Sequence, residues 1–286
     1  MAAPSPASET LVIEARQASK VLPAGVANLR KAFSDVSLEV HRGHRLALFS
    51  VNTYEAKSLL ECLAGVEQPD QGSVVHHGSV SWPVGTNQAF HGKLSGYLNA
   101  RFAAEVYSLP GQVDEDVRLI QDITGADDHT FHEPYGAWKS SMQKSLKLAV
   151  SLAFDFDVLT VGKISNWDHK SLHPESVRIR RLFEQRISNR ALVIAAPSQH
   201  KFALDYCDQG LAIVAGRLVY AGDPEVCLEL IKEEKQRLKY EFKQENSRRL
   251  EQLMLDNDDL SEDSDDEDIG SGFPDSDSGV RARSED

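Results

Sequence analysis

The sequence predicts an α/β fold in which a parallel sheet is interrupted by a helical insertion. Short apolar runs, the kind that form buried strands, recur along the chain, and a stretch of helical periodicity separates them into two groups. One strand–loop–helix segment in the first group has the order of a phosphate-binding loop. The 286 residues, 41% hydrophobic and 26% charged, suffice for one large or two small domains with a core.

Predicted strands lie on both sides of the insertion, which spans residues 91 to about 150. Each strand is a short run rich in Val, Leu, Ile or Ala, a composition typical of strands buried in a parallel sheet. Within the insertion, apolar residues recur at helical spacing. The predicted strands are 11–15, 36–40, 45–49, 74–82, 158–161, 191–196, 211–214 and 218–221, and the predicted helices of the insertion are 98–107, 113–124 and 142–153.

The C-terminal part of the chain has a different composition. A charged helix is predicted over 225–255, and its part from residue 233 onward extends past the α/β domain. From Asp256 to Asp286 there are thirteen Asp and Glu residues against two Arg, which accounts for most of the net charge of −13. Such a segment buries too little apolar surface to offset its ordering entropy, so 256–286 is predicted to be disordered, as is 1–10. We interpret the acidic segment as a solubilising tail, with docking onto a basic patch of a partner as the alternative.

Composition argues against several other classes of protein. No apolar run approaches the roughly 18 residues of a membrane span, and the N-terminus lacks a basic-then-apolar signal. No basic stripe with interleaved aromatic residues indicates nucleic-acid binding. Because Cys62, Cys207 and Cys227 lack metal-ligand spacing, a reducing compartment and no metal site are expected. We predict a cytoplasmic protein that associates with the inner membrane only through partners.

The segment SVNTYEAKSLLECLAG, residues 50–65, raises the functional question. An apolar run precedes it, and apolar residues at helical spacing continue to Gly65, where a helix would end. Strand, loop and helix therefore have the order of the motif G-x-x-x-x-G-K-[ST], yet its glycines and lysine are absent. The segment is either a nucleotide site with unusual residues or the remnant of one.

Several further stretches match one known family. They are Arg42-Gly43, Leu59-Leu60, Leu63-Ala64-Gly65, QPDQG at 68–72, SVSWPVGTNQAFHGKLSGYLNARFAAEVYSL at 79–109, FDFD at 154–157, and Tyr206-Cys207-Asp208 with Gly216-Arg217-Leu218. Over residues 11–232 the chain thereby resembles the ATPase subunits of ABC transporters that export capsular polysaccharide. The resemblance implies an ABC-type P-loop NTPase core with a helical insertion. It also implies two subunits that sandwich two ATP molecules, with Mg, and drive a membrane pore for a lipid-linked polysaccharide.

Aligned to that family without gaps, the loop has lost its phosphate-binding groups. Ser50, Thr53 and Glu55 stand where glycines let backbone N–H groups converge on phosphates. Ala56 replaces the phosphate-binding lysine, and Lys57 replaces the magnesium-binding hydroxyl residue. The Glu55 carboxylate would also repel a phosphate, by roughly 1 to 4 kcal/mol for two unit charges about 4 Å apart.

A deletion of one position in the alignment offers an alternative, because it places Ala56-Lys57-Ser58 on Gly-Lys-Ser. That register would turn the following helix by about 100° and misplace its apolar face. The gapless register fits both flanking segments and is preferred.

The remaining nucleotide positions of the family are also replaced. Leu22 stands for the aromatic that stacks on adenine, His91 for the glutamine that positions water and metal, Lys139 and Ser141 for the signature serine and glycine, Gly162 and Lys163 for the magnesium-binding carboxylate and the catalytic base, and Ser198 for the γ-phosphate-sensing histidine. Phosphoryl transfer depends on positioning and charge neutralisation, so the combined loss predicts the fold without the chemistry. No catalytic residue and no ATP or Mg cofactor is therefore expected.

We predict a non-catalytic subunit in capsular polysaccharide export, with an assembly or regulatory role. It would bind the membrane-spanning subunit, and it would form a homodimer or pair with an active paralogous ATPase. One alternative is an unusual ATPase that uses Lys57 and Ser58 with ATP and Mg; another is a regulatory adaptor that acts through its acidic tail. Partner contacts are expected after His91, where the family meets its membrane subunit, at Gly92, Leu94, Gly96, Asn99, Arg101 and Phe102.

Overall fold

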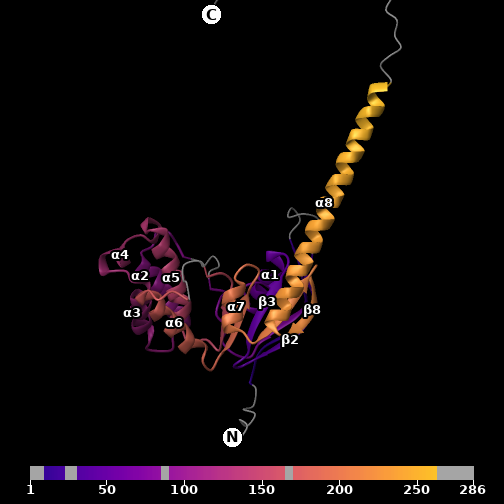
Figure 1. Ribbon diagram of the computed structural model, residues 1–286. Helices are drawn as coiled ribbons and strands as arrows, with labels where there is room; N and C mark the ends of the chain where they lie inside the picture. Colours follow the sequence, from indigo (N-terminus) through magenta and orange to yellow (C-terminus); the bar gives the residue numbers. More distant parts are fainter. Residues whose placement is uncertain (1–9, 23–30, 85–89, 165–169, 263–286) are drawn as a thin grey trace, which may run out of the picture. The chain divides into compact units, whose positions relative to one another are not determined.

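The computed structural model describes residues 10–22, 31–84, 90–164 and 170–262 (Figure 1). The chain divides into two compact units at Gln236. All strands of the described chain lie in the first unit, as do its helices up to the first turns of the last one. Among the described residues, no helix is both long enough and apolar enough to span a bilayer.

A five-stranded sheet forms the centre of the first unit. Its strand order is β5 (Val158–Val161), β6 (Ala191–Ala195), β3 (Arg45–Ser50), β7 (Gln209–Val214) and β8 (Arg217–Gly222). The first four strands run parallel, whereas β8 pairs antiparallel with β7 across a two-residue turn. Strands β5 and β6 consist entirely of buried residues, as expected for parallel strands that are covered on both faces.

A second, antiparallel sheet has the order β2 (Lys31–His41), β1 (Leu11–Val21) and β4 (Gln71–His76). Helix α1 (Thr53–Leu63) packs against strands of both sheets. Its buried side chains share one core with β1, β2 and one face of the parallel sheet: Ala56, Leu59, Leu60, Cys62 and Leu63. Helix α1 is thus the element through which the two sheets are joined.

The other face of the parallel sheet is covered by α6 (Pro174–Ile187) and α7 (His200–Tyr206), which contribute Phe183 and Phe202 to a second core. The same core extends into the helical insertion, which comprises α2 (Gly96–Tyr107), α3 (Val113–Thr124), α4 (Asp128–His132), a 3₁₀ turn (Tyr135–Ala137) and α5 (Ser140–Ala153). Figure 1 shows α2 to α5 gathered in one group.

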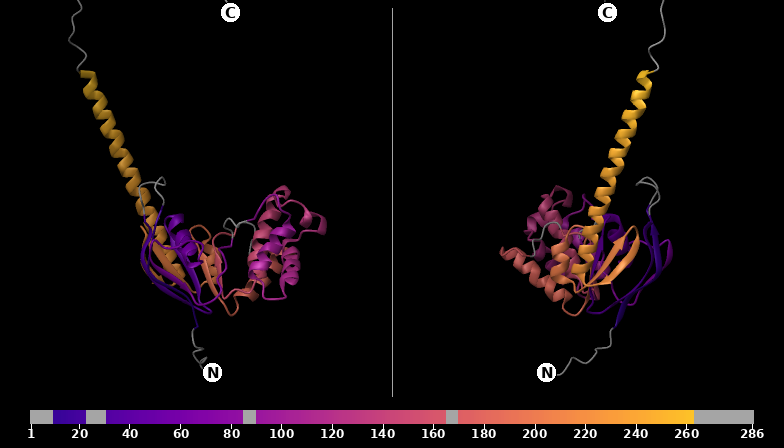
Figure 2. Two further views of the ribbon diagram at one scale, coloured as in Figure 1. Left: turned by 180° about the vertical axis from the view of Figure 1, so that it is seen from behind. Right: turned by 45° about the vertical axis from the view of Figure 1, so that its right-hand side comes forward.

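The last helix, α8 (Pro224–Glu262), is continuous across the boundary between the two units (Figure 2). Its first turns contribute Cys227, Leu228 and Ile231 to the core of the first unit. Helix α8 continues to Glu262, seven residues into the segment from Asp256 onward that was predicted to be disordered. Each added residue of a formed helix gains a hydrogen bond, so a helix can extend into polar sequence. The rest of the predicted tail and residues 1–9 lie outside the described part of the chain.

The predicted strand 74–82 is also only partly present. Strand β4 ends at His76, and beyond it Val80 and Val84 form isolated parallel bridges with the first and last residues of β5. The change of direction is held by Asp157, whose carboxylate accepts hydrogen bonds from the Ser79 backbone N–H at 2.9 Å and from its hydroxyl at 3.0 Å. The apolar run is thus shared between the antiparallel sheet and the edge of the parallel sheet.

Candidate functional site

The residues at the predicted nucleotide positions meet at one edge of the parallel sheet. Ser50 is the last residue of β3, Gly162 follows β5, and Ser198 follows β6, which lies between those two strands. In open α/β sheets, ligands bind outside the carboxyl ends of the strands. The sheet therefore brings together Ser50, Gly162 and Ser198, three of the positions that the sequence singled out.

The backbone that joins β3 to α1 is short and contains no left-handed residue. Only Val51 and Asn52 separate the end of β3 from Thr53, the first residue of α1. In the described chain, a positive φ outside glycine occurs only at Gln17, Asp35 and Ala215. Anion-binding nests alternate right- and left-handed residues so that consecutive N–H groups converge, and that alternation is absent here.

The first N–H groups of α1 already have acceptors within the chain. The Asn52 side chain caps the helix and accepts from the Tyr54 N–H at 3.0 Å. The Ser50 hydroxyl accepts from the Ala56 N–H at 3.4 Å and donates to the Asn52 carbonyl at 2.6 Å. At a helix N-terminus these N–H groups are the donors that would bind a phosphate. An incoming anion would therefore have to displace the Asn52 and Ser50 side chains from them.

Glu55 supplies the negative charge at this helix terminus. Its side chain completes a capping box by accepting from the Asn52 N–H at 3.4 Å. Its other oxygen accepts from the Gly216 N–H at 2.9 Å, and the residue is only 6% exposed. Gly216 lies in the β7–β8 turn at φ +74°, and its carbonyl accepts from the Ser34 N–H of β2 at 2.7 Å. The carboxylate thus connects α1 to both sheets.

The lysine next to this loop does not face the strand ends. Ala56, at the position of the phosphate-binding lysine, is fully buried in the core. Lys57 is on the exposed side of α1, and its ammonium lies 3.6 Å from the Glu61 carboxylate in the next turn. Burial raises the pKa of Glu61, and Lys57 opposes that shift. Of the Ser and Thr residues of α1, Thr53 is exposed and Ser58 is buried.

The ends of β5 and β6 are tied together by Gln199, a residue that the sequence analysis did not single out. Its amide N–H₂ donates to the carbonyls of Gly162 at 3.2 Å and Ala195 at 2.8 Å. Its amide oxygen accepts from the Ile164 N–H at 3.1 Å. A polar side chain one residue after Ser198, at a strand end, is the signal that could have pointed to it.

The other residues around this edge are either exposed or engaged with backbone. Lys163 and Ser198 are exposed, and the Gly162 and Lys163 N–H groups both donate to the Val84 carbonyl, at 2.9 and 3.0 Å. His200 is half-buried with its Nε2 3.2 Å from the Pro197 carbonyl, and burial lowers its pKa. Neither Gly162 nor Lys163 carries a carboxylate, so these two side chains offer no ligand of the kind that magnesium prefers.

The predicted base-stacking and signature positions lie elsewhere in the first unit. Leu22 packs against the core shared by α1 and the antiparallel sheet. Lys139 immediately precedes α5 and Ser141 lies in its first turn, both exposed. His91 is exposed at the start of the segment that leads into α2.

Two of the predicted partner-contacting residues are buried and shape this segment. Asn99 is 3% exposed; its amide oxygen accepts from the His91 N–H at 2.9 Å, and its N–H₂ donates to the carbonyls of His91 and Ser95 at 3.2 and 2.9 Å. Gly96 is buried against Trp138, whose ring would lie 2.2 Å from an added Cβ. Both residues hold the turn before α2 in place.

The remaining residues of that set lie on the surface of the insertion. Gly92 is exposed, and Arg101 bonds the Tyr97 hydroxyl and the Glu105 carboxylate, both at 2.9 Å. Four apolar side chains at intervals of four residues form what we call the α2 ridge: Leu94, Leu98, Phe102 and Val106, from 41% to 66% exposed. Exposed apolar rows of this kind are typical of protein–protein contacts.

Comparison with known proteins gives a consistent set of relatives. The chain is 24% identical over 176 residues to the polysialic acid transport ATP-binding protein KpsT of Escherichia coli, covering 62% of this chain and 76% of that protein. It is 25% identical over 194 residues to the capsule polysaccharide export ATP-binding protein CtrD of Neisseria meningitidis serogroup B, covering 66% and 84%. No protein-family model matches the chain.

Solved structures agree on the fold. The dimeric ATP-binding cassette MJ0796, in a post-hydrolysis state with ADP and Pi, superposes with a TM-score of 0.58 at 10% identity, over 74% of this chain and 98% of that one. The α/β fold with a helical insertion is therefore that of ABC ATP-binding domains, as predicted.

Proposed function

We propose that this chain, a homologue of the ATP-binding subunits of capsule polysaccharide exporters, is a non-catalytic ABC-type subunit of such an exporter. It would keep the fold and the partner surface of its relatives and have an assembly or regulatory role. It would pair with a second subunit of the same fold, either another copy or an active paralogue. It would reach the inner membrane through the membrane-spanning subunit.

The observation that carries the proposal is the closed N-terminus of α1. The Tyr54 and Ala56 N–H groups have side-chain acceptors, and the buried Glu55 carboxylate accepts from Gly216. A triphosphate placed here would meet the buried Glu55 carboxylate. If that carboxylate moved away from the phosphates, the Gly216 N–H would lose its acceptor. A buried group left unsatisfied costs about 1–3 kcal/mol, before any charge repulsion is counted.

The loss extends to the groups that drive phosphoryl transfer. Lys57 pairs outward with Glu61, and Gly162 and Lys163 provide no carboxylate for magnesium. Positioning and charge neutralisation supply nearly all the rate enhancement in this chemistry. We therefore expect neither ATP nor Mg to be a cofactor of this chain.

The proposed contact with the membrane-spanning subunit is the α2 ridge. Its four side chains are exposed, whereas Gly96 and Asn99 beneath them are buried and fix the turn that presents the ridge. A surface for docking does not require a working nucleotide site, because function resides in separate sites on a shared fold.

Titration calorimetry with ATP in the presence of Mg tests the loss of nucleotide binding. We expect no heat of binding at micromolar concentrations and no shift in melting temperature at millimolar ATP, since a ligand of the native state would raise it. Micromolar binding or Mg-dependent turnover that disappears in Lys57→Ala would instead support an active ATPase in the shifted register.

Capture of the exporter's membrane-spanning subunit tests the docking surface. Phe102→Asp should abolish capture without changing the melting temperature, because the side chain is 66% exposed. Leu172→Asp is a matched control, since Leu172 is 85% exposed outside the ridge. Removal of residues 263–286 should leave capture intact; if this deletion abolishes capture and Phe102→Asp does not, the chain is an adaptor that acts through its acidic tail.

A further inference from the structure

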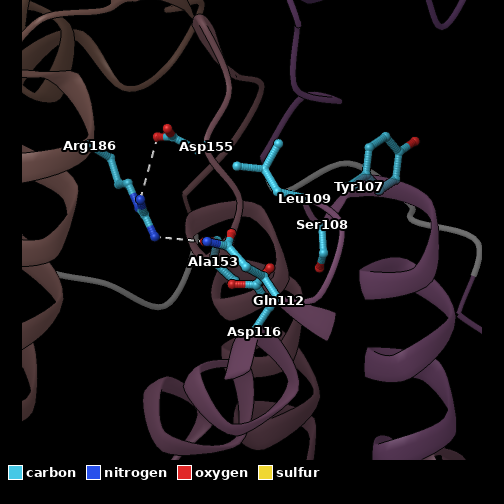
Figure 3. Close-up of a pocket in the computed structure, with 8 residues that line it drawn as sticks. All are labelled: Tyr107, Ser108, Leu109, Gln112, Asp116, Ala153, Asp155 and Arg186. Carbon is cyan, nitrogen blue, oxygen red and sulfur yellow. Dashed lines mark hydrogen bonds and ion pairs between the residues drawn. The ribbon is translucent and has the colours of Figure 1, made fainter. Parts of the chain in front are cut away.

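A small pocket opens beside the C-terminal end of the α2 ridge, between α2, α3, α5 and α6 (Figure 3). Its volume is about 240 Å³. Pockets for drug-sized ligands start at roughly 300 Å³, so this one suits a single long side chain rather than a whole small molecule. It is lined by Tyr107, Ser108, Leu109, Gln112, Asp116, Ala153, Asp155 and Arg186.

The Arg186 guanidinium, the cationic group in the pocket lining, is hydrogen-bonded to backbone carbonyls. Arg186 donates from Nε to the Leu152 carbonyl at 2.8 Å and from Nη2 to the Ala153 carbonyl at 2.6 Å. These are the last carbonyls of α5, so the guanidinium caps the negative end of that helix. Asp155 forms an ion pair with Arg190 and lies 3.6 Å from the Arg186 Nη1. Asp155 therefore has both arginines as direct partners, and the Arg186 N–H groups are engaged with α5.

The carboxylate of Asp116 is the charged group of the pocket that has no direct partner among the described residues. Within the described parts of the chain, no hydrogen bond or ion pair engages it, and Arg186, the cation that acts on it through space, is turned to α5. The Ser108 hydroxyl oxygen nearby is buried and has no hydrogen-bond partner among the described residues. Hydrogen-bonding groups of this kind are normally satisfied, so the pocket offers acceptors to an incoming donor.

An apolar rim connects the pocket to the α2 ridge. Tyr107, the last residue of α2, is 45% exposed, and Leu109 just beyond it is 58% exposed. The ridge ends at Val106, so the apolar surface continues along α2 to the edge of the pocket. Lysine and arginine bury their methylene stems on such surfaces while the charged end reaches a polar group.

We propose that this pocket receives one lysine or arginine side chain of the partner helix that covers the α2 ridge. The ammonium or guanidinium meets the Asp116 carboxylate, and the stem lies on Tyr107 and Leu109. The inference rests on the docking surface of the proposed function. It adds to the apolar α2 ridge one charged contact, at Asp116, which we call the anchor. It specifies the partner as an amphipathic helix that carries a basic residue at the end of its apolar face.

The anchor is tested without any partner by NMR titration of the isotope-labelled full chain with N-acetyl-arginine methylamide. Amide shifts should concentrate at residues 107–116, saturate in the millimolar range and weaken with added salt, because the contact is partly exposed. The neutral isostere N-acetyl-citrulline methylamide should shift these amides at least fivefold less at the same concentration.

Two variants make the assignment specific. Asp116→Asn should weaken arginine binding at least fivefold, whereas Glu115→Gln, which neutralises the exposed neighbouring carboxylate, should leave it unchanged. Equal binding of arginine and citrulline, shifts elsewhere in the chain, or full binding by Asp116→Asn would each overturn the inference.

Capture of the membrane-spanning subunit separates this inference from the function on which it rests. Capture that is lost in Phe102→Asp and weakened in Asp116→Asn supports both. Capture that is lost in Phe102→Asp but unchanged in Asp116→Asn overturns the anchor and keeps the docking surface. If neither variant affects capture, the docking surface itself is wrong.

Discussion

The Glu55 carboxylate and the Gly216 N–H form a buried hydrogen bond of 2.9 Å between residues 161 positions apart in the chain. The bond joins the first turn of α1 to the β7–β8 turn, at the same sheet edge as the predicted nucleotide positions. A residue that looks from the sequence like a source of repulsion is therefore part of the fold's own bonding.

We expect Glu55→Leu to destabilise the protein more than Glu55→Gln. Leucine leaves the buried Gly216 N–H without an acceptor, which costs about 1–3 kcal/mol. Glutamine keeps an acceptor and loses only the charge at the helix N-terminus, worth about 0.3–1 kcal/mol. Urea unfolding of both variants measures the difference, with the exposed Glu229→Gln on α8 as control. Equal losses for the two variants would contradict the bond to Gly216.

Gly96→Ala should destabilise the helical insertion. An added Cβ would lie 2.2 Å from the Trp138 ring, and overpacking of this kind costs about 1–3 kcal/mol. Gly92→Ala is the matched control, because its nearest neighbour would be 3.8 Å away, and surface changes usually stay within about 0.5 kcal/mol. Thermal unfolding compares the two. A Gly96→Ala protein as stable as the Gly92→Ala protein would refute the packing described for this turn.

His200 should make the protein less stable in mild acid. Burial lowers its pKa in the folded state, so the unfolded chain, with a pKa of about 6.5, binds the proton more readily. Stability is therefore retained above that pH and is lost as the pH falls through it. Between pH 7.5 and 5.5 the melting temperature should fall less in His200→Gln than in the wild type. Parallel curves would show that the imidazole does not contribute.

The three thiols should be slow to react in the folded protein. Burial raises the pKa of Cys62 and Cys227 to about 11, and it also raises the pKa of the buried Cys207. Because the thiolate is the nucleophile, labelling with a disulfide reagent at pH 8 should follow unfolding and then reach all three residues. A thiol that reacts rapidly before denaturant is added would contradict this burial.

The sequence predicted the elements with strong periodicity well. Strand β5 and helix α3 begin and end where predicted, because their apolar residues follow one period from end to end. Helix α6 was not predicted, since its segment RIRRLFEQR intersperses few apolar residues among arginines. The convergence of Ser50, Gly162 and Ser198 at one sheet edge was not predicted, because it depends on the strand order that the structure shows.

The bonding at that edge could not be predicted from the sequence. Gln199 acts by bridging two strand ends, and Glu55 acts through the β7–β8 turn, which follows the strand next to β3 at the same edge. Both depend on which backbone groups the fold brings within hydrogen-bond distance, and neither has a local pattern. The departures from the nucleotide-binding motif were visible in the sequence, whereas the hydrogen bonds of the α1 N-terminus and of Glu55 were visible only in three dimensions.

The hydrogen bonds that link α1 through Gly216 to β2 have a consequence for conformational change, if the chain acts in an exporter as proposed. A nucleotide-binding subunit changes shape when its ligand arrives and leaves, because the ligand favours one conformation over another. Here the groups that form the hydrogen bonds belong to the chain itself, so they are always present and do not arrive or leave. Under the proposed function, the alternation of the exporter would be set by its other subunits, and this chain would contribute a fixed geometry against which they move.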